Sequence, residues 1–149
     1  MHTDPIPEGY TAVTPYLITP DVDGLVKFLQ HVFYAEESLD RMQRSDGSVM
    51  HTEVRIGGAA LMMAEPMEGH PPMPSMVYVY VADVDAAYQR ALASEAKPVM
   101  APADQFYGDR NAGVTDPWGN MWWIGTHIED VSPEDLKTRA AAAANGGGE

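Results

Sequence analysis

Hydrophobic and polar positions follow a helical period at two places in the chain, and the two places match. After Asp21, apolar residues return at the i, i+3, i+4, i+7 spacing of a one-sided helix, and the same spacing follows Asp83, 62 positions later. Each copy opens with Asp-Val-Asp, which puts an aspartate where its side chain can cap the helix start. The repeat predicts two copies of one structural unit.

A strand with period-two alternation precedes each predicted helix, and three more strands follow it. In the second copy Val77, Val79 and Val81 share one face, while Met76, Tyr78 and Tyr80 share the other. The predicted strands span residues 12–19, 37–43, 48–56 and 59–64 in the first half, and 76–82, 97–102, 111–115 and 121–126 in the second. Turn residues such as Gly57-Gly58 separate them. Each half therefore reads strand–helix–strand–strand–strand.

These elements predict an α+β fold in a single domain, since 149 residues is an ordinary domain length. We expect one βαβββ module in residues 10–64 and a second in 76–127. The proline-rich segment 65–75 is interpreted as their linker. A capping box beginning at Ser132 predicts a C-terminal helix and tail within residues 132–149.

Composition narrows the classes of partner. The net charge of −13 disfavours binding to nucleic acid or to anionic lipid. The absence of cysteine excludes disulfides and thiolate metal sites. No apolar run is long enough for a membrane helix, and residues 1–20 lack the pattern of a secretion signal. We therefore expect a cytoplasmic protein.

Four segments resemble a known family over about residues 10–136. They read TPYLITPDVDGLVKFLQHVF, VMHTEVRIGGAALMMAE, VYVADVDAAYQRAL and PADQFYGDRNAGVTDPWGNMWWIGTHIEDVSPEDL. They are similar to the vicinal oxygen chelate superfamily of glyoxalases, bleomycin-resistance proteins and dioxygenases, in particular its PhnB-like subgroup. The resemblance implies that two βαβββ modules pair into a curved, barrel-like mixed sheet around a cavity. It also implies a homodimer, because module pairing in this superfamily often occurs across two chains.

The resemblance further implies where a divalent metal would be bound. Its ligands usually come from the first and last strand of each module, which here places them at Thr14, Met62, Met76 and Trp123. None of these is a histidine or a carboxylate, and a thioether is a poor ligand for hard divalent ions. We expect no metal centre at the usual positions and no cofactor, with a displaced divalent metal as the alternative.

The strand 48–56 contributes a cluster of ionisable residues. A turn at Gly57-Gly58 pairs Glu53 with Met62, so His51, Glu53 and Arg55 should project on the same face as Met62. His51 and Glu53 could serve as an acid/base pair or as two ligands of a displaced metal. The alternative is a hydrogen-bonded structural network.

Further candidates lie in the second half. Arg110 could clamp an anionic group, or it could hold a loop by pairing with Asp109, Asp104 or Asp116. His127 is expected to have a structural or surface role. Large apolar side chains predict a pocket for a flat organic ligand, unless they simply fill the core. The predicted ligand-binding residues are Met62, Met76, Tyr78, Tyr80, Trp123 and Arg55.

Three functions are compatible with these residues. The favoured one is a protein that binds a small organic molecule in an aromatic cavity without the usual metal. The alternative is a lyase, isomerase or epimerase using His51 and Glu53, with Arg55 or Arg110 stabilising a developing oxyanion. The third is an interaction protein with a vestigial cavity.

Overall fold

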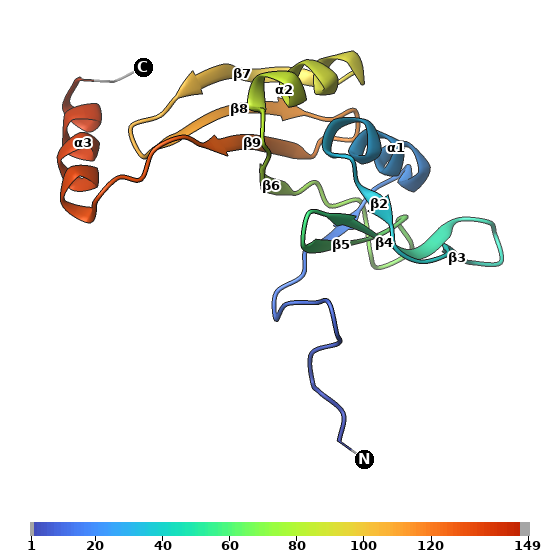
Figure 1. Ribbon diagram of the computed structural model, residues 1–149. Coiled ribbons are helices and arrows are strands. Elements are labelled where there is room, and N and C mark those ends of the chain that lie inside the picture. Colours follow the sequence, from blue (N-terminus) through green and yellow to red (C-terminus); the bar gives the residue numbers. More distant parts are fainter. Residues whose placement is uncertain (1, 147–149) are drawn as a thin grey trace. The chain divides into compact units, whose positions relative to one another are not determined.

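The computed structural model describes residues 2–146 and divides the chain into two compact units. The first unit comprises the residues up to Ser75 together with Pro117–Asn120. The second comprises Met76–Asp116 and the residues from Met121 onward. Each unit has its own sheet and its own packed helix (Figure 1).

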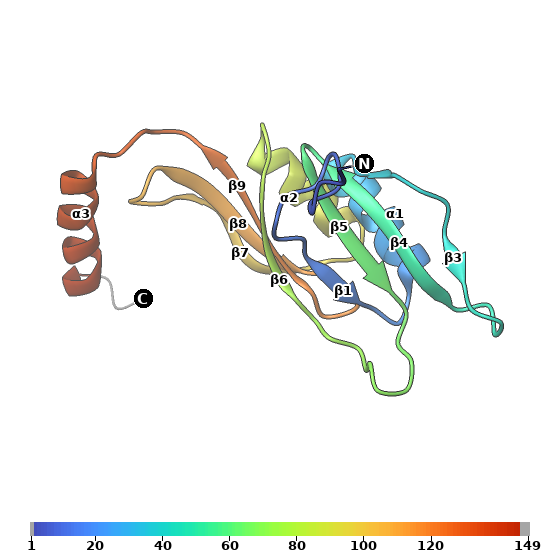
Figure 2. The ribbon, with the colours of Figure 1, turned by 90° about the horizontal axis from the view of Figure 1, so that it is seen from below.

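The first unit contains a five-stranded sheet. Its strands are β1 (Tyr16–Ile18), β2 (Glu36–Glu37), β3 (Met42–Gln43), β4 (Val49–Ile56) and β5 (Ala59–Ala64). β1 runs parallel to β5, and β4 runs antiparallel to β5; the three lie side by side in the order β1, β5, β4 (Figure 2). The hairpin turn lies at Gly57-Gly58, and Glu53 pairs with Met62 as the sequence predicts.

Helix α1 (Val22–Phe33) supplies the other half of this unit's core. Its N-cap is Asp21, whose carboxylate accepts a 2.9 Å hydrogen bond from the backbone N–H of Gly24. The helix ends at Phe33, and the C-cap residue Tyr34 adopts a left-handed conformation. Its apolar stripe packs against the sheet. The fully buried side chains of this core include Leu17, Val22, Leu25, Leu29, Val32, Val54 and Met63.

The second unit repeats this plan with a four-stranded sheet. Its elements are β6 (Met76–Tyr80), α2 (Val84–Ala93), β7 (Lys97–Asp104), β8 (Asp109–Thr115) and β9 (Met121–His127). The strand order is β6-β9-β8-β7, with β6 parallel to β9 and the other pairs antiparallel. Asp83 caps α2, which covers one face of the sheet (Figure 1). Trp122 and Ile124 of β9 are fully buried, as the alternation predicts.

The C-terminal helix α3 (Pro133–Gly146) is longer than the capping box suggests. Ser132 accepts a hydrogen bond from the N–H of Asp135, as a capping residue does. The helix then continues through the alanines that the sequence reading assigned to the tail, because alanine has the highest helix propensity. No residue of α3 is buried. The end of the predicted tail, after Gly146, lies outside the described residues.

The predicted α+β class is confirmed, and both sheets are open. The second unit follows the predicted order strand–helix–strand–strand–strand, whereas four strands follow the helix of the first unit. The predicted strand 37–43 is wrong in part, because residues 38–41 leave the sheet and only the short strands β2 and β3 remain. Within this break the Arg41 guanidinium pairs with Glu37 and Asp23. The first predicted strand is also shorter than expected, beginning after Pro15, which has no N–H to donate to a neighbouring strand.

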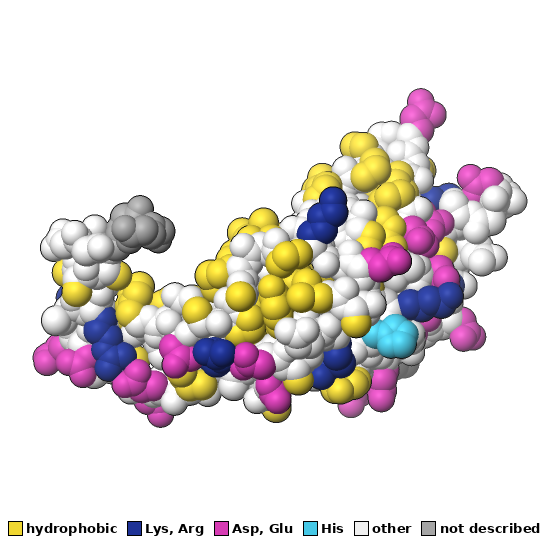
Figure 3. Space-filling view, turned by 90° about the horizontal axis from the view of Figure 1, so that it is seen from above, with side chains coloured by type: hydrophobic (Ala, Val, Ile, Leu, Met, Phe, Trp, Pro, Cys, Tyr) yellow, Lys and Arg dark blue, Asp and Glu magenta, His cyan; other side chains and the backbone are white. Residues whose placement is uncertain are grey.

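The surface mixes charges of both signs. Figure 3 shows acidic and basic side chains interspersed on one face, with hydrophobic side chains between them. Ion pairs such as Arg139 with Glu129 place some of the few basic groups beside acidic ones. Among the described residues, no helix is long and apolar enough to cross a membrane.

Candidate functional site

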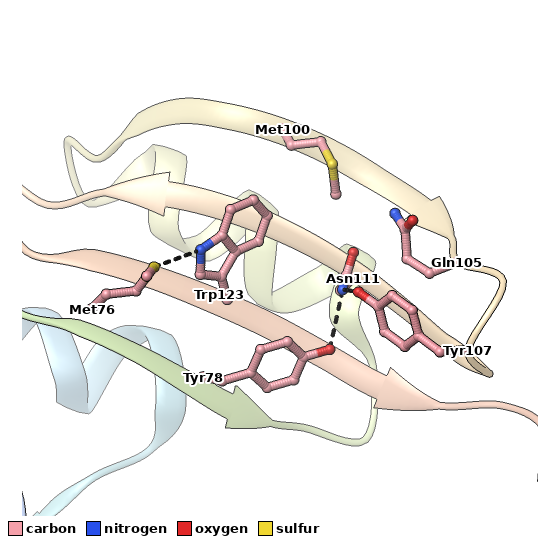
Figure 4. Close-up of a pocket in the computed structure, with 7 residues that line it drawn as sticks. All are labelled: Met76, Tyr78, Met100, Gln105, Tyr107, Asn111 and Trp123. Atoms are coloured by element: carbon pink, nitrogen blue, oxygen red, sulfur yellow. Dashed lines mark hydrogen bonds between the residues drawn. The ribbon is translucent and has the colours of Figure 1, made fainter. Parts of the chain in front are cut away.

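The second unit holds a cavity of about 500 Å³ on the sheet face opposite α2. Seven residues from β6, β7, β8, β9 and the β7–β8 turn line it: Met76, Tyr78, Met100, Gln105, Tyr107, Asn111 and Trp123 (Figure 4). Three of the predicted ligand-binding residues, Met76, Tyr78 and Trp123, are among them. The walls are mostly sulfur-containing and aromatic side chains, with a few polar atoms.

Strand register explains why these rings lie together. β6 runs parallel to β9 and places Tyr78 beside Trp123. The indole N–H of Trp123 donates a 3.1 Å hydrogen bond to the sulfur of Met76, which fixes the edge of the indole ring. The predicted shared face of Met76, Tyr78 and Trp123 therefore exists.

Two glycines in neighbouring strands make room for the rings. A Cβ atom at Gly113 would lie 2.7 Å from the Trp123 ring, and one at Gly125 would lie 2.5 Å from the Tyr78 hydroxyl oxygen. Both distances are shorter than Cβ contacts in real structures, so a side chain at either glycine would force the ring that crosses it to move. The sequence reading missed this role, although a glycine inside a strand pattern signals a close approach.

A buried carboxylate organises the polar end of the cavity. Asp109, which is 4% exposed, accepts hydrogen bonds from the hydroxyls of Tyr78 at 2.7 Å and Tyr80 at 2.8 Å. Its other oxygen lies 3.0 Å from Nδ1 of His127, whose Nε2 lies 2.7 Å from Asp130. Burial by itself raises the pKa of Asp109, but the hydrogen bonds from His127 and the two tyrosines outweigh it, and the pKa is lower than usual. Tyr80, a predicted ligand-binding residue, is not among the residues that line the cavity and is connected to Tyr78 through Asp109.

The same contacts shift the pKa values of the groups that surround Asp109. Burial, together with the neighbouring carboxylate, raises the pKa of Tyr78 well above its ordinary value. Hydrogen bonds to Asp109 and Asp130 raise the pKa of His127. Asp109 therefore stays ionised and Tyr78 stays protonated at neutral pH.

Asn111 links the two tyrosines that frame the cavity. Its side-chain amide nitrogen donates to the hydroxyl oxygen of Tyr78 at 3.1 Å and to that of Tyr107 at 2.6 Å (Figure 4). The residue is 2% exposed. The sequence reading placed Asn111 at the start of a strand without a role, because its importance depends on two tyrosines at distant positions.

The predicted acid/base residues form a separate network in the first unit. His51 Nε2 lies 3.1 Å from Glu53 Oε1, and His51 Nδ1 lies 2.8 Å from the hydroxyl of Tyr16. The other oxygen of Glu53 accepts a hydrogen bond from Tyr10. Burial alone would raise the pKa of Glu53, but the hydrogen bonds from Tyr10 and His51 lower it. Because both nitrogens of His51 are engaged, the half-exposed Tyr16 is the end of the chain that a ligand can reach.

The remaining candidates are held by other contacts. Arg55 donates to the carbonyl of Gly9, and its guanidinium carbon lies 4.6 Å from the centre of the Tyr10 ring. Arg110 is paired with Asp85 at 2.8 Å and Asp104 at 3.1 Å. Of the predicted partners of Arg110, Asp104 is correct, whereas Asp109 and Asp116 are not among its hydrogen-bonded carboxylates. Met62 lies in β5 of the first unit, beside Tyr16.

The positions at which the superfamily would hold a metal do not fit one. Met76 and Trp123 are hydrogen-bonded to each other, and the indole N–H offers no lone pair to a cation. Thr14 and Met62 provide a hydroxyl and a thioether. Within residues 2–146, no group of three or more histidine or acidic side chains could hold a metal ion.

The chain is similar in sequence to two mycobacterial proteins. An uncharacterized protein of Mycobacterium bovis is 33% identical over 146 residues, covering 91% of this chain and 95% of that protein. An uncharacterized protein of Mycobacterium tuberculosis H37Rv is also 33% identical, covering 91% of this chain and 85% of that protein.

Solved structures show the same fold. TioX from Micromonospora sp. ML1 superimposes with a TM-score of 0.63 at 28% identity, covering 79% of this chain and 99% of TioX. A glyoxalase/bleomycin resistance protein/dioxygenase from Nocardioides superimposes at 0.58 with 22% identity, covering 83% of this chain and 87% of that protein. Residues 9–124 match the family model of these proteins. The chain therefore belongs to the Glyoxalase/Bleomycin resistance protein/Dioxygenase superfamily.

Proposed function

We propose that the chain binds a small, flat organic molecule in the cavity of the second unit, without the metal that the superfamily often uses. The observation that supports this is the lining itself, in which apolar walls from Met76, Met100 and Trp123 surround a few fixed polar atoms. A volume of about 500 Å³ is typical of small-molecule sites, and so is this division between apolar walls and convergent polar groups.

The chemistry of the walls favours an aromatic ligand. The Trp123 face offers a stacking surface, and its edge is held by Met76. Methionine side chains are flexible and polarisable, so Met76 and Met100 can adjust to rings of different outline. The superfamily name covers both resistance proteins and enzymes, so membership alone does not choose between binding and catalysis.

The proposal includes the finer expectations from the sequence. We place the chain in the PhnB-like subgroup, in the cytoplasm, as a homodimer and without a cofactor. Light scattering tests the homodimer, and metal analysis of protein purified without added metal tests the absence of a cofactor. One tightly bound divalent ion per chain would contradict the metal-free proposal.

Methionine-methyl NMR tests the binding site directly. The chain has ten methionines, so ¹³C-methyl labelling gives ten probes, and two-ring aromatic compounds are titrated into the protein. We expect the signals of Met76 and Met100 to shift, while that of Met50, an exposed residue of the first unit, stays in place. Trp123→Leu should weaken binding at least about tenfold, since it removes the stacking surface. Failure of every compound to move Met76 and Met100 would reject the proposal.

A second candidate function is proton transfer in the first unit. The observation that favours it is the chain of contacts from Glu53 through His51 to Tyr16. Of these three residues, Tyr16 lines a cavity of about 330 Å³. Arg44 lines the same cavity and brings a positive charge that a developing oxyanion would need. In this arrangement the Tyr16 hydroxyl would pass its proton to Nδ1 of His51 while its oxygen takes a proton from the carbon beside the substrate carbonyl, leaving an enolate. The reverse transfers would restore the substrate and both side chains.

Solvent-deuterium exchange tests this second candidate. If the candidate is correct, a small carbonyl compound incubated in D₂O should gain deuterium beside its carbonyl faster with the protein than without it. Tyr16→Phe should abolish the acceleration, because phenylalanine has no proton to transfer. His51→Gln should retain the fold and slow the exchange, because it removes the group that receives the Tyr16 proton. Equal exchange with and without the wild-type protein would remove this candidate.

A further inference from the structure

We propose that the ligand of the second-unit cavity is a neutral aromatic molecule that donates an N–H or O–H hydrogen bond to Oδ1 of Asn111. This inference rests on the proposed binding function and names the class of ligand. It follows from how the hydrogen bonds around Asn111 are distributed.

The Tyr78 hydroxyl fixes which way the Asn111 amide faces. Tyr78 donates its only proton to the carboxylate of Asp109 at 2.7 Å, so its oxygen can only accept from Asn111. The amide nitrogen must therefore face Tyr78, and it also reaches the Tyr107 hydroxyl. With both amide protons directed at tyrosine oxygens, Oδ1 points away from the two hydroxyls (Figure 4).

Oδ1 of Asn111 has no hydrogen-bond partner. Within residues 2–146, it is the one buried side-chain oxygen or nitrogen for which no partner exists. Native proteins rarely leave a buried acceptor unpaired, and such an atom calls for a specific explanation. Asn111 lines the cavity, although Oδ1 itself has almost no accessible surface. A ligand donor that displaces the side chains over Oδ1 would supply the missing hydrogen bond.

The surroundings exclude an anionic ligand. Asp109, whose carboxylate bonds the same tyrosine hydroxyl as Asn111, would repel a second negative charge. The cationic groups nearby are already engaged by carboxylates, Arg110 by Asp85 and Asp104 and His127 by Asp109 and Asp130. The ligand should therefore be neutral, flat and apolar over most of its surface, with one donor directed at β8.

Three related probes test the inference on the wild-type protein. Indole has one N–H donor, 1-methylindole has none, and 3-methylindole keeps the N–H while adding the same methyl group elsewhere. We expect indole and 3-methylindole to shift the methyl signals of Met76 and Met100, and 1-methylindole to bind about five- to thirtyfold more weakly. Equal or tighter binding of 1-methylindole would overturn the inference while leaving the binding function intact. If none of the three moved these signals, the proposed function itself would fail.

The Asn111→Leu variant tests whether Asn111 is the residue that distinguishes indole from 1-methylindole. Leucine has a similar size and no amide, so the variant should bind indole and 1-methylindole equally. Unchanged discrimination in a folded variant would show that another group receives the ligand N–H, which also overturns the inference. If Asn111→Leu does not fold, the comparison of the three probes on the wild-type protein still decides.

Discussion

At the scale of single residues, neighbours along β8 have opposite surroundings, and this decides their roles. Asp109 is buried against Tyr78, Tyr80 and His127, whereas the adjacent Arg110 is partly exposed and paired with Asp85. Successive side chains of a strand point to opposite faces, so Asp109 could not be the partner of Arg110 that the sequence suggested. Both residues were identified from the sequence. The hydrogen-bond partners of Asp109 could not be predicted, because Tyr78 and Tyr80 come from another strand.

The pH dependence of stability should depend on His127. Its pKa is raised by hydrogen bonds to Asp109 and Asp130, so its contribution is fully present below the unfolded pKa of about 6.5 and is lost as pH rises through the raised native value. The pKa of Asp109 is lowered, so Asp109 stays ionised throughout this window. Urea unfolding of the wild type and His127→Gln should therefore show a larger difference at about pH 5.5 than at about pH 9. A difference that grew with pH would contradict this assignment.

At the scale of elements, both units contain a contact between a tyrosine hydroxyl of the first strand and a polar side chain of the sheet, but the polar side chain differs between the units. Tyr16 lies beside Met62, which pairs with Glu53; Tyr78 lies beside Trp123, which pairs with Gly113. Two positions before Glu53 and Gly113 stand His51 and Asn111, and each contacts the tyrosine hydroxyl of its own unit.

The sequence repeat could not reveal this equivalence. The offset is 62 between Tyr16 and Tyr78 but 60 between His51 and Asn111, because the loops of the two halves differ in length. A fixed offset of 62 therefore aligns the first strands and the helices but misaligns the third strands. The same tyrosine contacts a titratable ring in the first unit and an amide in the second. This difference is why we propose proton transfer only for the first unit and neutral recognition for the second.

The close approach of β8 to Trp123 gives a prediction about Gly113. Gly113→Ala would place a methyl group 2.7 Å from the indole ring, so the ring must move. We expect a loss of about 1–3 kcal/mol in the free energy of unfolding, together with weaker indole binding. Gly58→Ala is the matched control, because Gly58 has no atom within 4 Å of its added Cβ; the free energy of unfolding should stay within about 0.5 kcal/mol. Equal effects of the two substitutions would contradict the role given to Gly113.

At the scale of the whole molecule, periodicity and turn residues were enough to predict the duplicated α+β plan. The hairpin register at Gly57-Gly58 followed from turn chemistry alone. The assignment of Pro117–Asn120 to the first unit could not be predicted, because it depends on contacts distant in sequence. Asn120 accepts a hydrogen bond from the N–H of Ser75, and a Cβ at Gly24 would lie 2.4 Å from Trp118.

This path of the chain predicts that the two units unfold together. The chain leaves the first unit after Ser75, returns at Pro117 and leaves again after Asn120, so the turn between β8 and β9 is built into the packing of the first unit. Loss of the contacts of Asn120, which is 1% exposed, would release the β8–β9 connection. Urea titration followed by the methyl signals of Met63 in the first unit and Met100 in the second should give one common midpoint, as expected for a cooperative transition. Two separate midpoints would mean that segment 117–120 can detach without affecting β8 and β9.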